Sequence, residues 1–246
     1  MTQHHTQIDF DKNPPMPLTD YEQTVKRVNV GYDLTFLLTE CFLHALGKSD
    51  LHLLVIGVGG GAEIERFLPH HLGWKITGVD PSQQMLARAQ AKVAAFDLGE
   101  RVTLVQGTIE HLAPDMHFDA ATCLYVLHFL PDDAKLVLLR AVRDRLQPEA
   151  PLYLVSGVRV DETNFGVPNS QLQADFLGAW RHYGEVMGMP AEQMAGIVAQ
   201  LAEQMSHPQV ATADRVQELL REAGFTHVAP FCSLLGAIYG WIARVM

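Results

Sequence analysis

The chain has few basic residues, few cysteines and no long hydrophobic run. Its 18 Lys and Arg are outnumbered by 28 Asp and Glu, and they form no cluster. The net charge of -10 therefore argues against a nucleic-acid partner, which would be bound through clustered positive charge. The three cysteines lack C-x-x-C spacing and the first residues do not resemble a secretory signal, so we expect a cytoplasmic protein. No apolar stretch approaches the length of a membrane span.

Several catalytic signatures are absent as well. The chain has no G-x-S-x-G elbow and no Walker turn with lysine before serine or threonine, which argues against common hydrolase and kinase designs. Its twelve histidines include the pairs His4-His5 and His70-His71, but adjacent residues on a helix or strand point apart. We therefore expect no metal site.

Short apolar segments alternate with helical segments through most of the chain. Because these apolar segments are nearly continuous, they indicate strands that are buried on both faces of a parallel sheet. Helices are expected over residues 21–46, and two antiparallel strands around Gly236 within residues 226–245. The sequence predicts an α/β protein with a doubly wound, Rossmann-like sheet of about seven strands and a C-terminal antiparallel hairpin. The expected parallel strands are LHLLVI, WKITGV, RVTLVQ, FDAATCL and PLYLVS.

Two segments depart from this alternation. Residues 1–20 are polar and contain proline, which predicts a flexible N-terminal arm. Residues from about 161 to 208 are rich in Met, Gln and aromatic residues, and they indicate a helical cap inserted into one domain that covers residues 21–246. Trp180 and Tyr183 of this cap are candidates for a substrate pocket, although such residues more often pack against the body. The apolar content of the cap and tail is also compatible with a homodimer.

The segment VIGVGGGAEIERF places a glycine-rich turn between an apolar strand and a helix. Gly57, Gly59 and Ala62 fit the dinucleotide pattern G-x-G-x-x-G/A, while Gly59 and Gly61 also fit a turn that holds S-adenosylmethionine. Glycine permits a sharp bend and a close approach to the ligand. Asp80 ends the next expected strand, where a carboxylate can accept hydrogen bonds from both ribose hydroxyls. These residues indicate a nucleotide site without deciding which nucleotide it binds.

The motifs that follow the turn decide between the two ligands. VIGVGGGAE, GVDPSQQML, VQGTIEHL and FDAATCLYVLHFLPD occur in the order of the motifs of one family, and the chain from residue 31 onward resembles the class I S-adenosylmethionine-dependent methyltransferases. The resemblance implies in-line transfer of a methyl group from S-adenosylmethionine to a small-molecule acceptor. It also implies these cofactor-binding residues: Tyr32, Gly57, Gly59, Gly61, Asp80, Pro81, Met85, Gly107, Thr108, Ile109, Leu124 and Tyr125.

By this resemblance each part of the cofactor has its own neighbours. The glycines would surround the methionine end, and Asp80 would hold the ribose. Met85, Thr108 and Ile109 would border the adenine, and backbone near Leu124 and Tyr125 would receive the amino group. Two of the departures from the family concern the cofactor site: Gly57 stands where many members carry an acid, and Thr108 where an Asp is common. The third is the turn over residues 147–150, QPEA in place of the usual lysine-proline-glycine-glycine, which we expect to affect only the connection.

A narrower similarity suggests a different reaction. The N-terminal helices, the cap and the C-terminal tail are similar to carboxy-S-adenosylmethionine synthase and its relatives. That synthase grips the added carboxylate with a cap arginine, whereas AEQMAGIVAQLAEQM contains no arginine and Arg181 lies earlier in the cap. A synthase of this kind, a decayed binding module without turnover, and a nicotinamide-dependent oxidoreductase are the alternatives to methyl transfer.

His128 is the candidate catalytic residue. It follows the fourth expected strand, at the carboxyl edge where open α/β sheets place their ligands, and it could act as a general base toward a hydroxyl or amine acceptor. The alternative is a histidine that packs beside Phe129 and has no part in the reaction. Methyl transfer from a sulfonium needs no covalent catalyst, so the main task of the protein is to hold donor and acceptor in line.

Overall fold

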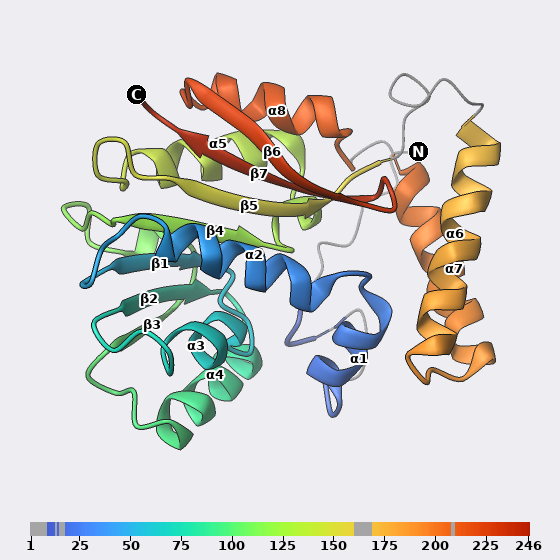
Figure 1. Cartoon of the computed structure of the whole chain (residues 1–246), viewed down its shortest axis with the longest axis horizontal. Helices are drawn as coiled ribbons and strands as arrows, with labels where there is room; N and C mark the ends of the chain where they lie inside the picture. Colours follow the sequence, from blue (N-terminus) through green and yellow to red (C-terminus); the bar gives the residue numbers. More distant parts are fainter. Residues whose placement is uncertain (1–8, 13, 15–17, 160–168, 208–209) are drawn as a thin grey trace.

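The computed structural model describes residues 9–12, 14, 18–159, 169–207 and 210–246 of the chain. Within them, seven strands form one sheet with helices on both faces (Figure 1). The strands are β1 (His52–Ile56), β2 (Lys75–Asp80), β3 (Val102–Gln106), β4 (Ala120–Leu124), β5 (Leu152–Gly157), β6 (His227–Leu234) and β7 (Ile238–Arg244).

Helices connect most of these strands. The α-helices are α1 (Tyr21–Val28), α2 (Tyr32–His44), α3 (Ala62–Phe67), α4 (Gln83–Ala95), α5 (Asp132–Arg143), α6 (Asn169–Val186), α7 (Ala191–Ser206) and α8 (Ala213–Glu222). Two short 3-10 helices, η1 (Ile109–His111) and η2 (Leu127–Phe129), follow β3 and β4. The predicted N-terminal helices, helical cap and C-terminal hairpin are therefore confirmed as elements.

The strands lie in the order β3-β2-β1-β4-β5-β7-β6. The first five run parallel, and β7 runs antiparallel to both β5 and β6. Because β1 pairs with β2 on one side and β4 on the other, the connections leaving β1 and β4 diverge at this point of the sheet. Such a switch point opens a crevice at the carboxyl ends of the strands, which is where doubly wound sheets bind ligands.

Alternate residues of the central strands face opposite sides of the sheet. In β1, Leu53 and Val55 contact the layer that contains α2, α3 and α4, whereas Leu54 and Ile56 contact the layer that contains α5 and α8. All four side chains are buried. Since both faces are covered, the strand must be apolar at every position, and this explains the unbroken apolar runs in the sequence.

The cap helices α6 and α7 pack on each other and lie beyond the carboxyl ends of the parallel strands, beside α1 (Figure 1). Trp180 of α6 is buried, and its indole N–H donates a hydrogen bond to the carbonyl of Val28 at the end of α1. One turn later, the hydroxyl of Tyr183 donates to the carbonyl of Lys26 at 3.4 Å. The two aromatic residues thus join the cap to α1.

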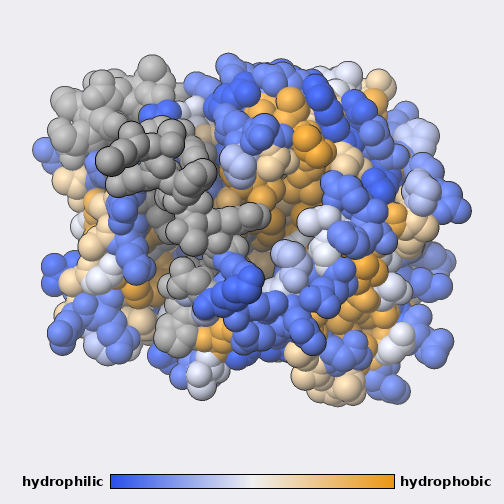
Figure 2. Space-filling model, turned by 180° about the vertical axis from the view of Figure 1, so that it is seen from behind, coloured by the Kyte–Doolittle hydropathy of each residue, from blue (hydrophilic) through white to orange (hydrophobic). Residues whose placement is uncertain are grey.

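Hydrophilic residues cover most of the rear surface, and hydrophobic residues gather in a hollow near its middle (Figure 2). Large hydrophobic side chains that reach the surface belong to separate elements, such as Leu37 of α2, Val137 of α5 and Val186 of α6. None of the helices in the described residues is both long enough and apolar enough to cross a membrane.

The substitution Trp180→Phe tests how the cap is held. Phenylalanine keeps an aromatic ring but removes the N–H, so the Val28 carbonyl loses its partner and the smaller ring leaves space. We expect the free energy of unfolding, measured in urea, to fall by about 2 kcal/mol. Tyr183→Phe, which removes a longer hydrogen bond from a half-buried residue, is the matched control and should cost less than about 0.5 kcal/mol. Equal losses in the two variants would contradict this role of the indole.

Candidate functional site

The glycine turn, residues 57–61, connects β1 to α3 through three left-handed residues. Gly57, Gly59 and Gly61 have φ values of +66°, +51° and +80°. L side chains rarely adopt this conformation, so the turn depends on glycine at these positions. Gly57 is also restricted by space, because a Cβ there would overlap the side chain of Val126. The predicted turn is therefore a tight connection at the switch point, and no acid can stand at position 57 without moving Val126.

Asp80, the last residue of β2, lies against this turn. One carboxylate oxygen accepts a hydrogen bond from the Gly59 N–H at 2.9 Å, and the other accepts from the Ser82 N–H at 2.9 Å. The residue is only 8% exposed, and burial raises its pKa, while the two hydrogen bonds act in the opposite direction. Each oxygen still has a free lone pair. The carboxylate can therefore accept further hydrogen bonds, as binding of a ribose requires.

The N-terminus of α4 is capped by a residue that sequence reasoning did not single out. Asp11 accepts hydrogen bonds from the Ser82 hydroxyl at 2.6 Å and from the backbone N–H groups of Gln83 and Gln84 at 2.9 and 3.0 Å. The Ser82 hydroxyl in turn accepts from the Met85 N–H at 3.1 Å. No local pattern could reveal Asp11, because it lies 71 residues before Ser82. Flexibility of residues 1–20 as a whole stays a prediction.

Aromatic rings gather at the same edge. Tyr32 begins α2, and its ring centroid lies 5.2 Å from that of Tyr125, which follows β4. Tyr125 has a left-handed φ of +61°, and its hydroxyl shares a hydrogen bond with Thr35 at 3.0 Å. Phe10 contacts Phe129 with centroids 6.0 Å apart. These contacts bring Phe10 and α2 to the carboxyl end of β4.

The residues expected around the adenine follow β2 and β3. Gly107 has a φ of +131° and its N–H donates to the Asp80 carbonyl at 2.9 Å. Thr108 precedes η1, and its backbone N–H donates to His111 Nδ1 at 3.1 Å. Met85 of α4 and Ile109 of η1 are buried apolar side chains. With Pro81 and Leu124 at the ends of β2 and β4, every residue that the resemblance implied for the cofactor lies along one edge of the sheet.

His128 lies in η2 next to the end of β5. Its Nδ1 accepts a hydrogen bond from the Gly157 N–H at 3.2 Å, which places the ring hydrogen on Nε2. Burial, with a smaller effect from Lys135, lowers the pKa of the ring to about 4. A ring with so low a pKa is neutral and only weakly basic at neutral pH. The structure therefore supplies a structural contact for His128, and its role as a base stays a prediction.

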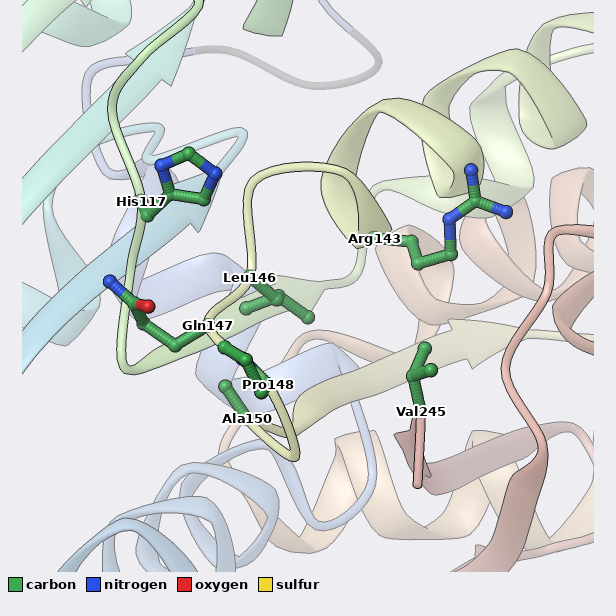
Figure 3. A pocket seen from close by; sticks show the side chains of 7 residues that line it. All are labelled: His117, Arg143, Leu146, Gln147, Pro148, Ala150 and Val245. Atoms are coloured by element: carbon green, nitrogen blue, oxygen red, sulfur yellow. The ribbon is translucent and has the colours of Figure 1, made fainter.

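Trp180 and Tyr183, the expected pocket residues, use their polar atoms to bind the backbone of α1. Their part in a substrate pocket is not tested by these contacts. A hollow of about 550 Å³ lies elsewhere, at the amino ends of β4 and β5, and Figure 3 shows the side chains around it. This hollow is at the opposite edge from the glycine turn, so it is separate from the crevice that contains Asp80.

Sequence reasoning also missed Glu63 of α3. This residue is 3% exposed, and its carboxylate accepts a hydrogen bond from the Thr122 hydroxyl of β4 at 3.4 Å. Burial raises the pKa of Glu63 to about 7. The pattern AEIERF gives no signal for this, because Glu63 is next to the core residue Ile64 and resembles an exposed acid in the first turn of a helix.

Comparison with known proteins adds an independent observation. Residues 54–152 match a family model described as a methyltransferase domain. A ubiquinone biosynthesis O-methyltransferase from Pseudoalteromonas translucida is 29% identical over 109 residues, which are 44% of each chain. The chain thus spans less than half the length of the curated relatives that it matches.

Solved structures resemble the chain over more of its length. Magnesium protoporphyrin IX methyltransferase from Synechocystis, determined with bound S-adenosylmethionine, has a TM-score of 0.59 at 14% identity, over 96% of this chain and 93% of that one. An O-methyltransferase family protein from Burkholderia thailandensis has a TM-score of 0.56 at 14% identity, over 92% and 56%. At these identities the likeness shows the fold, which is the Rossmann-like fold of these methyltransferases.

The pH dependence of stability tests the environment of His128. Its pKa of about 4 in the folded protein lies below the ordinary value of 6.5, so the unfolded chain binds the proton more tightly. His128 therefore adds about 3 kcal/mol to the free energy of unfolding above pH 6.5. We expect this stabilisation to be lost as the pH falls from about 6.5 to about 4. Urea unfolding at several pH values measures this.

The variant His128→Phe should lack this part of the pH dependence. His70→Asn, at an exposed position, is the control and should leave the free energy of unfolding within about 0.5 kcal/mol of that of the parent protein. An unchanged slope between about pH 6.5 and 4 in His128→Phe would show that the ring is not held neutral by its surroundings.

Proposed function

We propose that this protein is a cytoplasmic S-adenosylmethionine-dependent methyltransferase that acts on a small-molecule acceptor. The observation that carries the proposal is the contact of the buried Asp80 carboxylate with Gly59 at the switch point of the sheet. That contact lies inside residues 54–152, which match the methyltransferase domain model. The fold of the solved methyltransferases supports the same conclusion.

The residues present fit this cofactor. Asp80 has free acceptor capacity for a ribose, and Met85 and Ile109 provide apolar surface beside it for an adenine. Gly59 lies beside Met85, since a Cβ there would be 3.4 Å from Met85 Cε. The lack of side chains in the turn lets a ligand come close to its backbone, as the methionine end requires. S-adenosylmethionine supplies a methyl group on a positively charged sulfur, which is a good electrophile.

The chain itself has to bind, orient and exclude water. In-line displacement gains most from holding the two reacting atoms close and collinear, so rigid neighbours matter more than a covalent catalyst. The hydrogen bond between Tyr125 and Thr35 and the contact between the rings of Tyr125 and Tyr32 provide such rigidity at the edge of the crevice. Any proton on the acceptor must leave. Since Nδ1 of His128 accepts the Gly157 N–H and Nε2 carries the ring hydrogen, His128 can take that proton only if the Gly157 contact breaks.

An oxygen acceptor is favoured by the relatives, since the curated proteins that match are named O-methyltransferases. Ordinary methyl transfer is favoured over a synthase that carries an added carboxylate on the cofactor. Arg181, the arginine of α6, is half-exposed and pairs with Glu185 at 3.0 Å, and α7 contains no arginine. Mass spectrometry of the ligand that copurifies with the protein tests this, because a carboxylated cofactor would favour the synthase.

Calorimetry tests the assignment of the cofactor. We expect S-adenosylmethionine and S-adenosylhomocysteine to bind to the purified chain, and NAD to show no heat of binding. Binding of NAD alone would overturn the proposal. Binding of the adenosyl ligands without turnover over a broad panel of acceptors would instead indicate a binding module.

The substitution Asp80→Asn tests the ribose contact. The amide keeps the size of the side chain but has one acceptor oxygen and no charge, so we expect the affinity for S-adenosylhomocysteine to fall about 10- to 100-fold. Asp119→Asn is the matched control, because Asp119 accepts the His52 N–H at 2.8 Å near the opposite edge of the sheet. We expect this control to cost stability and leave the affinity unchanged. If Asp80→Asn binds S-adenosylhomocysteine as tightly as the parent protein does, Asp80 does not bind the ribose.

A further inference from the structure

A buried carboxylate that forms no ion pair among the described residues follows the glycine turn. Glu63 is the second residue of α3 and is 3% exposed. Among the described residues, the side-chain contact of its carboxylate is the 3.4 Å hydrogen bond from Thr122, a long one. Burying a carboxylate is costly unless it is paired and well hydrogen-bonded. The position therefore calls for an explanation that the packing of the core does not provide.

Two cations, Arg66 and Lys92, act weakly on the Glu63 carboxylate, but each is paired with another acid. Arg66 forms an ion pair with Asp33, and its guanidinium lies over the ring of Phe36 at 5.0 Å from the centroid. Lys92 of α4 forms ion pairs with Glu22 at 2.8 Å and with Glu65 at 2.6 Å. Neither lies within 4 Å of the Glu63 carboxylate among the ion pairs of the described residues. The protein thus surrounds Glu63 without neutralising it.

Glu63 faces residues of the candidate site. Burial and the Glu63 carboxylate together raise the pKa of Tyr32, so the carboxylate acts on the ring at the start of α2. Its hydrogen-bond partner Thr122 lies in β4, two residues before Leu124. Position 57, at the start of the turn, has no room for a side chain because of Val126. Glu63 is accordingly the buried acid placed between the turn, α2 and the end of β4.

We propose that the Glu63 carboxylate pairs with the ammonium group at the amino-acid end of an adenosyl amino acid bound at the glycine turn. This inference rests on the proposed function, and it adds a named counter-charge for one part of the ligand. The ammonium would supply the partner that neither Arg66 nor Lys92 supplies. The cost of burying the charge in the free protein is then recovered when the ligand binds.

The pairing has a consequence for protons. Burial raises the pKa of Glu63 to about 7, so most of the free protein carries a proton there at about pH 6. An ammonium favours the ionised form, and binding at that pH must release the proton. The neighbouring Tyr32 and Cys123 do not contribute, because burial raises the pKa of each and both stay neutral between about pH 6 and 8.

Calorimetry in buffers of different ionisation enthalpy measures this release. S-adenosylhomocysteine is titrated into the full chain at about pH 6 and about pH 8. We expect release of about 0.9 proton at pH 6 and about 0.1 at pH 8 for a group with a pKa of about 7. Methylthioadenosine, which lacks the amino-acid end, should bind without release of a proton. This comparison uses the unaltered protein and does not depend on the folding of a variant.

The substitution Glu63→Gln assigns the proton to this residue. We expect it to abolish the release at pH 6 and to weaken S-adenosylhomocysteine binding about 10- to 100-fold at pH 8, with methylthioadenosine unaffected. Its melting temperature at pH 8 should not fall, because a neutral amide replaces a buried charge. The control Glu65→Gln, on the same helix and paired with Lys92, should leave both proton release and affinity unchanged.

The outcomes separate the two proposals. If S-adenosylhomocysteine binds and Glu63→Gln releases the same number of protons as the parent, the role of Glu63 is overturned while the proposed function stands. Equal proton release with methylthioadenosine has the same meaning, because that ligand has no ammonium. If neither adenosyl ligand binds, the proposed function fails and this inference fails with it.

Discussion

The hydrogen bond from the Gly59 N–H to the Asp80 carboxylate joins the ends of β1 and β2, and the candidate site depends on it. It requires a backbone that turns through three left-handed residues immediately after β1, which glycine permits. The same carboxylate accepts the N–H of Ser82 and so positions the start of α4. One acid therefore organises the turn, the end of a strand and the beginning of a helix around a single crevice.

Charge is buried at this edge in two different ways. Asp80 accepts hydrogen bonds from two backbone N–H groups, so its charge is stabilised in the free protein and its oxygens can still accept from a ligand. Glu63 has a long hydrogen bond from Thr122 and no ion pair in the described part of the chain, so ionising its buried carboxyl group costs free energy in the free protein. Binding sites commonly contain polar groups that destabilise the free protein, because a group whose hydrogen bonds are already complete adds little to the affinity for a ligand.

Segments far apart in the chain enclose the crevice. Asp11 caps α4, Phe10 contacts Phe129, and Tyr32 of α2 contacts Tyr125 after β4. The cap is joined to the body through Trp180 and Tyr183, which donate hydrogen bonds to the backbone of α1. Residues before β1 therefore both form part of the crevice and connect it to the cap. This places α1 and α2 between the crevice and the cap.

Local patterns were sufficient for the sheet and for the backbone of the site. Apolar runs, the glycines of the turn and Asp80 at a strand end all report on neighbours in sequence, and the structure confirms the strands, the hairpin and the position of Asp80. The sequence by itself determined the fold and the edge of the sheet at which Asp80 and the glycine turn meet. Only the tertiary structure decided which polar groups are buried there and which are hydrogen-bonded, such as the buried Glu63, the helix-capping Asp11 and the neutral ring of His128. Burial and pairing depend on residues that meet through folding, and spacing along the chain does not record them.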